Sequence, residues 1–161
     1  MKKISFLLLI LAFSFFAGRK IWRHFHVPDM PLNHVDLSTE TGEKLKTETI
    51  KQPYLLVSYF QSWCGDCIRE APSIEALQKS LGKEKLEVIL ISDEDWPKIK
   101  RFSGLSKTNL PVYQSGTSLE DLGIHIYPTT WLLGPDRQIM MVKQEGFDWN
   151  SEEVIKLIQK N

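Results

Sequence analysis

The chain has 161 residues, with 20 Lys and Arg against 20 Asp and Glu, so its formal net charge is zero. This length and a hydrophobic content of 42% fit one ordinary domain plus a short extension. Because Lys and Arg form no dense stripe and no aromatic residues are interleaved with them, the sequence predicts no nucleic-acid partner.

The N-terminal segment has the charge order of an export signal. Two lysines precede an apolar run over residues 4–18, and Arg19 follows it. We therefore expect a signal peptide or an N-terminal membrane anchor over residues 1–20, and an extracytoplasmic location. The run is shorter than a usual bilayer span. Residues 16–18 form a poor cleavage site, which favours an uncleaved anchor over a cleaved signal, and no cysteine is placed to carry a lipid.

The rest of the chain alternates apolar runs with helical patterns. Pro28 and Pro31 interrupt regular structure, so we expect a linker over residues 21–28 and one folded domain over residues 29–161. In chain order the patterns predict a hairpin over 35–49, a strand over 54–60, a helix from 64 to 81, a strand over 86–92, a helix over 96–102, a strand over 110–113, a helical turn over 118–122, strands over 129–133 and 138–143, and a final helix capped at Asn150 or Ser151. This alternation favours an α/β fold.

Cys64 and Cys67 are the two cysteines of the chain, and an apolar strand leads directly into them. A C-x-x-C unit at the start of a helix can close a disulfide, and the positive end of the helix dipole favours a thiolate on the first sulfur. Cys64, with its sulfur facing out, is therefore predicted to be the nucleophile and Cys67 the shielded resolving partner. A zinc site would need about four ligands. A purely structural disulfide across so short a loop would remove little unfolded-state entropy.

Several separated positions together resemble one family. Residues 29–161 resemble the thioredoxin fold, and more closely the exported, membrane-tethered thiol-disulfide oxidoreductases of the ResA and TlpA type. The resemblance is carried by Trp63-Cys64-Gly65-Asp66-Cys67, Glu70, Pro72, Tyr127-Pro128-Thr129 and Gly146, in the expected order and spacing. It implies a central mixed β-sheet flanked by helices, with an N-terminal hairpin and a short insertion before the strand that starts at Pro128.

The resemblance also implies a client-binding surface around the cysteine pair. Pro128 is expected to follow a cis peptide bond and to lie against the disulfide, so that Tyr127 presents backbone groups to an incoming peptide. Trp63 either shapes this surface or packs in the core. Gly65, Asp66 and Thr129 support the site.

Glu70 is the predicted proton acceptor. Thioredoxin carries a buried aspartate six residues before its first cysteine, and this chain has Ser58 there, which cannot accept the proton. Glu70 lies three residues after Cys67 on the same helix face, and related exported reductases carry a glutamate at this position. Burial would raise its pKa towards the working range of a base. The alternative is an exposed glutamate in the first turns of the helix.

Asp66 stands where many relatives have a proline. A carboxylate beside the pair disfavours a Cys64 thiolate, raises the thiol pKa and moves the couple towards a reductant. The effect shrinks if the side chain points into water.

These observations predict a thiol:disulfide oxidoreductase that acts outside the cytoplasm and reduces client proteins, with no cofactor beyond the redox-active disulfide and no metal. The expected partners are clients with disulfides, the membrane through the N-terminal segment, and a membrane electron donor that re-reduces the pair. Apocytochrome c is a client suggested by the family analogy alone.

Two other classes remain open. A peroxiredoxin-like thiol peroxidase would normally carry Pro-x-x-x-Thr-x-x-Cys, whereas residues 60–63 before Cys64 are Phe-Gln-Ser-Trp. A non-catalytic copper-binding module would need further soft or imidazole ligands, and His125 is the histidine nearest in sequence to Pro128.

Overall fold

The computed structural model describes residues 30–32 and 35–160. The expected export segment over 1–20 and the linker over 21–28 lie outside these residues. Within the described ranges, no helix is both long and apolar enough to cross a membrane.

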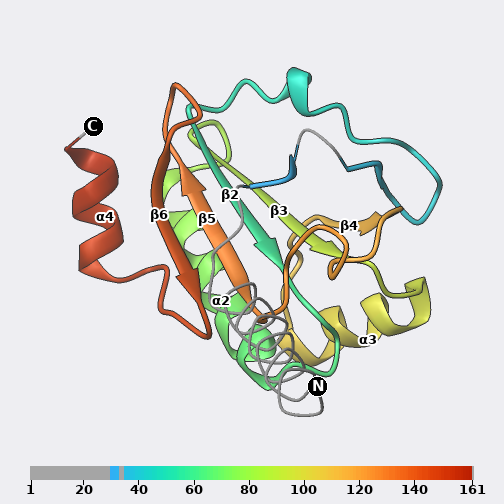
Figure 1. The fold of residues 1–161 in the computed structure, drawn as a ribbon. Helices are drawn as coiled ribbons and strands as arrows, with labels where there is room; N and C mark the ends of the chain where they lie inside the picture. The colour runs from blue at the N-terminus through green and yellow to red at the C-terminus, as the bar shows by residue number, and fades with distance from the viewer. Residues whose placement is uncertain (1–29, 33–34, 161) are drawn as a thin grey trace, which may run out of the picture.

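One six-stranded mixed sheet forms the centre of the molecule (Figure 1). Its strands are β1 (Leu37–Ser38), β2 (Tyr54–Tyr59), β3 (Leu86–Ser92), β4 (Val112–Ser115), β5 (Thr129–Leu133) and β6 (Ile139–Gln144), in the order β1-β4-β3-β2-β5-β6. β2, β3 and β4 are parallel, and the other three strands run antiparallel to their neighbours. All six residues of β2 are buried, as its mainly apolar run predicts.

The helices α2 (Gly65–Leu81), α3 (Trp96–Ser106) and α4 (Glu152–Gln159) bury their apolar residues in one core cluster. Ile74, Phe102 and Val154 from these helices meet Leu56 and Val88 from the sheet there. Figure 1 shows α2 running along β5 and β6. The helices therefore cover one face of the sheet.

The opposite face of the sheet has a second core cluster. Val57, Ile89 and Trp131 meet Leu37 and Leu119 there. Leu37 belongs to β1 itself, whereas Leu119 comes from the segment between β4 and β5, and this connecting segment covers the face.

The predicted elements are present, with shifted ends. The strands over 86–92 and 129–133 and the end of the helix at Leu81 match, and Gly82 ends that helix with φ of 90°. α3 runs four residues beyond the expected 102, because its buried face continues to Ser106. β4 and β6 are displaced by two residues and one residue towards the C-terminus.

Two short predicted elements are present in minimal form. The hairpin over 35–49 is short: Ser38 bridges Lys44, and the Leu45 backbone N–H donates to the Leu37 carbonyl at 2.9 Å. Residues 118–122 form one helical turn, in which the Leu122 N–H donates to the Ser118 carbonyl at 3.2 Å. Gly123, at φ of 80°, reverses the chain there.

Candidate active site

Cys64 and Cys67 form a disulfide at the point where β2 gives way to α2. Cys64 is the N-cap of α2, and its Sγ accepts a hydrogen bond of 3.1 Å from the Cys67 backbone N–H. The same N–H and the helix dipole stabilise a negative charge on Cys64 when the pair is reduced. In this oxidised form Cys64 exposes 6% of its surface and Cys67 exposes 3%. These values are too similar to distinguish the attacking from the resolving cysteine, so that assignment stays a prediction.

An aromatic pair, an exposed Trp63 and a half-buried Tyr127, stands beside the disulfide. Trp63 is 71% exposed, which excludes the alternative that it packs in the core. Its ring meets Tyr127 edge-on, with centroids 6.0 Å apart. The Tyr127–Pro128 peptide bond is cis, as the resemblance implies, and Pro128 is buried. Thr129 begins β5, and its hydroxyl donates to the Ile126 carbonyl at 2.6 Å.

Glu70 is buried in the first turns of α2, with 3% of its surface exposed. Its Oε1 accepts a hydrogen bond of 2.7 Å from the Thr130 hydroxyl, and its Oε2 accepts one of 3.0 Å from the Phe147 backbone N–H. Ser58 Oγ lies 2.8 Å from the same Thr130 oxygen. A hydroxyl carries one proton, so while Thr130 donates to Glu70 it accepts from Ser58.

Burial raises the pKa of Glu70 to about 7. The bonds from Thr130 and Phe147 oppose this rise because they favour the charged carboxylate. The buried Trp149 indole N–H, which has no partner at hydrogen-bonding distance, acts in the same direction as these bonds. The negative charge of Asp66 adds a smaller upward contribution to the pKa. Glu70 is therefore a carboxyl that can take up or release a proton near neutral pH.

The Asp66 side chain is partly exposed to solvent. It is 47% exposed and forms an ion pair with Arg69, one turn further along α2. Both features weaken its influence on a Cys64 thiolate. Gly146 packs closely here, since a Cβ added to it would lie 3.3 Å from Asp66 Oδ1.

A cavity of about 280 Å³ lies next to Glu70 on this side. Asp66, Arg69, Glu70, Ser73 and residues 146–148 line it.

The sequence reasoning missed the partners of Glu70. Thr130 and Phe147 lie 60 and 77 residues away along the chain. The signal that could have indicated Thr130 is the polar pair Thr129-Thr130 at the start of an otherwise apolar, fully buried strand. The sequence excludes Ser58 as a proton acceptor but carries no local sign of its hydrogen bond to Thr130.

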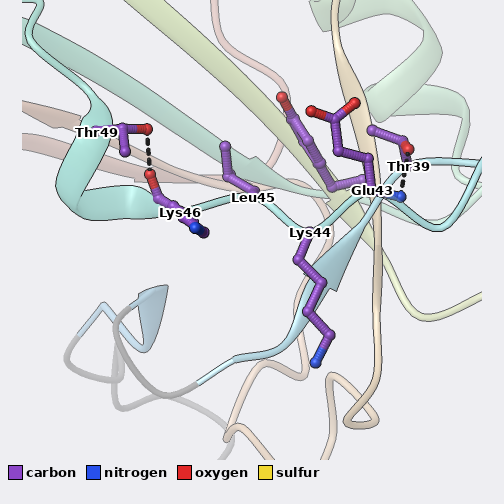
Figure 2. Close-up of a pocket in the computed structure, with 7 residues that line it drawn as sticks. Thr39, Glu43, Lys44, Leu45, Lys46 and Thr49 are labelled. Atoms are coloured by element: carbon purple, nitrogen blue, oxygen red, sulfur yellow. Dashed lines mark hydrogen bonds between the residues drawn. The ribbon is translucent and has the colours of Figure 1, made fainter.

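A second pocket, of about 550 Å³, lies on the side of the turn at residues 39–43 (Figure 2). Thr39, Glu43 and Tyr113 are among its lining residues, and Lys44 points away from Glu43 in this view. Its lining contains no residue of the Cys64–Cys67 motif, so it is not the site of the sulfur chemistry.

The described part of the chain contains no group of three or more His, Cys, Asp or Glu side chains that could hold a metal ion. His125 therefore does not join the two sulfurs in a metal site there, and the copper-binding alternative gains no support.

Taken together, the fold and the cysteine pair define a thiol-disulfide oxidoreductase of thioredoxin-like architecture. The chain belongs to the AhpC/TSA family, whose model matches residues 26–142. It is 26% identical over 150 residues to the thiol-disulfide oxidoreductase ResA of Halalkalibacterium halodurans, an alignment that covers 91% of this chain and 83% of the relative.

Two further similarities concern the thioredoxin-like part. The thioredoxin-like protein YneN of Bacillus subtilis is 26% identical over 102 residues, which are 60% of this chain and 59% of YneN. The thioredoxin-related protein of Neisseria meningitidis has a similar fold, with a TM-score of 0.63, 18% identity, and coverage of 78% of this chain and 100% of the other.

Proposed function

We propose that this protein reduces disulfides of client proteins outside the cytoplasm. In the reduced enzyme the Cys64 thiolate attacks one client sulfur, forming a mixed disulfide while the other client sulfur leaves as a thiolate. Cys67 then loses its proton to the Glu70 carboxylate and attacks Cys64 Sγ. The second client thiol leaves, the Cys64–Cys67 disulfide closes, and two electrons have passed to the client.

The observation that carries this proposal is the buried carboxyl of Glu70, three residues after Cys67 on the same helix. A group with a pKa of about 7 is largely ionised above neutral pH and can accept the proton of a thiol. When ionised, its negative charge also disfavours a second negative charge on the nearby sulfurs. A less stable thiolate makes the disulfide form relatively more favourable, which is the property of a reductant.

The partners of the reaction follow from its electron balance. Each turnover leaves the enzyme oxidised, so a dithiol donor must re-reduce it. For an exported domain we propose a membrane protein as this donor, with the N-terminal segment holding the enzyme at the membrane. Apocytochrome c is the proposed client within the broader class of disulfide-containing proteins, so the protein would act in cytochrome c maturation.

The direction of electron flow is tested by the reduction potential of the Cys64–Cys67 pair, measured by equilibration with dithiothreitol. We expect a value closer to the about −270 mV of thioredoxin than to the about −120 mV of the oxidant DsbA. A value near that of DsbA would overturn the assignment as a reductant.

The client class is tested by turnover. The enzyme should reduce insulin with dithiothreitol as electron source, and Cys64→Ser should not. A peptide with an oxidised C-x-x-C-H segment, the haem-attachment motif, should be reduced with a higher kcat/KM than insulin if apocytochrome c is the client. Equal rates would remove that finer assignment and leave the general one in place.

A further inference from the structure

Two consecutive acidic residues after β3 hold the loop that carries the cysteines. The Glu94 carboxylate accepts hydrogen bonds from the backbone N–H and the hydroxyl of Ser62. Asp93 reaches two different segments: its Oδ1 accepts from Gln61 Nε2 at 2.7 Å, and its Oδ2 accepts from the Leu119 backbone N–H at 2.8 Å. Asp93 therefore joins the cysteine loop to the segment that leads into Pro128.

The connection continues from Leu119 to the aromatic pair. The Ile124 N–H donates to the Leu119 carbonyl at 2.9 Å, and the Tyr127 hydroxyl donates to the Ile124 carbonyl at 3.1 Å. Leu119 and Ile124 are at most 1% exposed, so this segment is fixed in the core. Tyr127 then meets Trp63, two residues after Gln61, which closes a ring of contacts around the client-binding side of the disulfide.

The geometry favours a carboxylate at the centre of this ring. Asp93 offers two acceptor oxygens, and each is used by a donor from a different segment. Asparagine has the same shape but only one acceptor oxygen, so it can bond both segments only if the Gln61 amide turns over and accepts from the asparagine Nδ2. Hydrogen bonds to an ionised acceptor are also stronger than those to a neutral amide.

We propose that Asp93 is a positioning residue for protein clients: by tying the two segments together, it fixes the relative placement of Trp63 and Tyr127 on which a client chain docks. The role rests on the proposed reduction of protein disulfides. Asp93 bonds to the two segments and to neither sulfur, so its contribution should be felt by a protein client and not by a small thiol that reaches the disulfide directly.

The experiment compares Asp93→Asn with Asp95→Asn. The control removes the same charge two residues away, at an exposed N-cap that accepts from the Lys98 N–H, where asparagine caps equally well. For Asp93→Asn we expect kcat/KM for insulin to fall about tenfold, mainly through a higher KM. The rate at which dithiothreitol reduces the enzyme disulfide should stay within about twofold of the native rate. Asp95→Asn should change neither.

Two additional variants separate positioning from loss of fold. Gln61→Met removes one donor to Asp93 and retains the Leu119 bond, so it should reproduce part of the KM effect even if Asp93→Asn folds poorly. Tyr127→Phe removes the hydroxyl at the far end of the ring. Because both changes act through one ring, the effects of Asp93→Asn and Tyr127→Phe on kcat/KM should be less than additive.

Three results would overturn the role of Asp93: equal losses with insulin and dithiothreitol, the same loss in Asp95→Asn, or full additivity with Tyr127→Phe. The native enzyme provides a separate readout. If it does not reduce insulin at all, the proposed function fails and the role of Asp93 fails with it. If the native enzyme is active and Asp93→Asn matches it, only the role of Asp93 fails.

Discussion

Burial raises the pKa of Glu70, and three hydrogen-bond donors lower it. The resulting pKa of about 7 lies far above the ordinary value of 4.5, so the carboxyl is protonated below neutral pH and cannot accept a proton there. The resolving step should therefore accelerate as pH rises through about 7 and then level off. Glu70→Gln should slow this step by about a hundredfold and remove the inflection, as measured by rapid-quench decay of the mixed disulfide.

The matched variant for this prediction is Thr130→Val, which keeps the shape of the side chain and the Glu70 carboxyl. Since the Thr130 bond lowers the pKa of Glu70, its loss should move the inflection to higher pH without abolishing it. An unchanged pH profile in Glu70→Gln would reduce Glu70 to a structural residue.

The roles of the two cysteines can be separated by trapping. Cys64 caps the helix and receives the Cys67 N–H, so its thiolate is the stabilised one and should attack first. Cys67→Ser should then accumulate a covalent mixed disulfide with clients, visible on non-reducing gels, and Cys64→Ser should not.

The same pair of variants tests the peroxidase alternative. If Cys67→Ser retained full turnover with dithiothreitol, and peroxide consumption depended on Cys64 alone, the reductase assignment would be wrong. The protein would then be better described as a thiol peroxidase.

At the residue scale, the sequence indicated the groups on one helix better than those brought together by the fold. Cys64, Cys67 and Glu70 lie within seven positions on one element, so helical spacing alone relates them. Thr130 and Phe147 reach Glu70 from β5 and from the segment after β6, and no local pattern encodes that approach. The pKa of Glu70 depends on these partners, so its direction could be predicted but not its value.

At the scale of elements, one serine ties α2 to the segment that precedes α4. The Ser73 hydroxyl donates to the Glu70 backbone carbonyl at 2.8 Å and accepts from the Trp149 backbone N–H at 3.1 Å. This segment also delivers the Phe147 N–H to Glu70. Ser73→Ala leaves the Trp149 N–H without this acceptor and should lower the free energy of unfolding by about 1–2 kcal/mol, measured by urea denaturation.

The control is Ser103→Ala in α3. Ser103 is equally half-buried, but its hydroxyl only returns to the Ile99 carbonyl of its own helix. This substitution should change stability by less than about 0.5 kcal/mol, since alanine is the better helix former. An equal loss of unfolding free energy in both variants would show that the Ser73 hydroxyl does not stabilise the contact between α2 and the segment before α4.

The ends of elements were predictable where a local signal fixes them. Gly82, with its positive φ, ends α2 where the sequence indicated. Where the end depends on tertiary contact, the sequence misplaced it: β4 begins at Val112, two residues later than expected, where Val112 pairs with Leu90 of β3. The α3 C-terminus similarly follows burial of Phe102 and Ser106 and not a stop signal.

At the scale of the whole molecule, the alternation of strands and helices predicted the α/β class but not which face each segment covers. The resemblance supplied the mixed sheet, and the structure adds that the helices share one face while connecting segments cover the other. That division places Leu119 and Ile124 next to the cysteine loop, so the contacts of Asp93 could not be inferred from local patterns.

The location of the whole molecule is open to a direct test. If the apolar run over residues 4–18 is an uncleaved anchor, the protein isolated from cells should begin at or near Met1. It should also stay in the membrane fraction after a high-salt wash, because salt weakens charge contacts and not burial in lipid. A soluble form beginning near Arg19 would favour a cleaved signal.

The side of the membrane is tested separately, and the cysteine pair is the probe. Cys64 and Cys67 are the two cysteines of the chain, so after mild reduction of intact cells a membrane-impermeant maleimide should label the protein without lysis. Cys64→Ser/Cys67→Ser is the control and should remain unlabelled. We expect this labelling whether the N-terminal segment is retained as an anchor or cleaved as a signal, because the thiols face the outside in both cases. Labelling that required lysis would place the thiols in the cytoplasm and contradict the proposed site of action, while leaving the thiol-disulfide chemistry of the site intact.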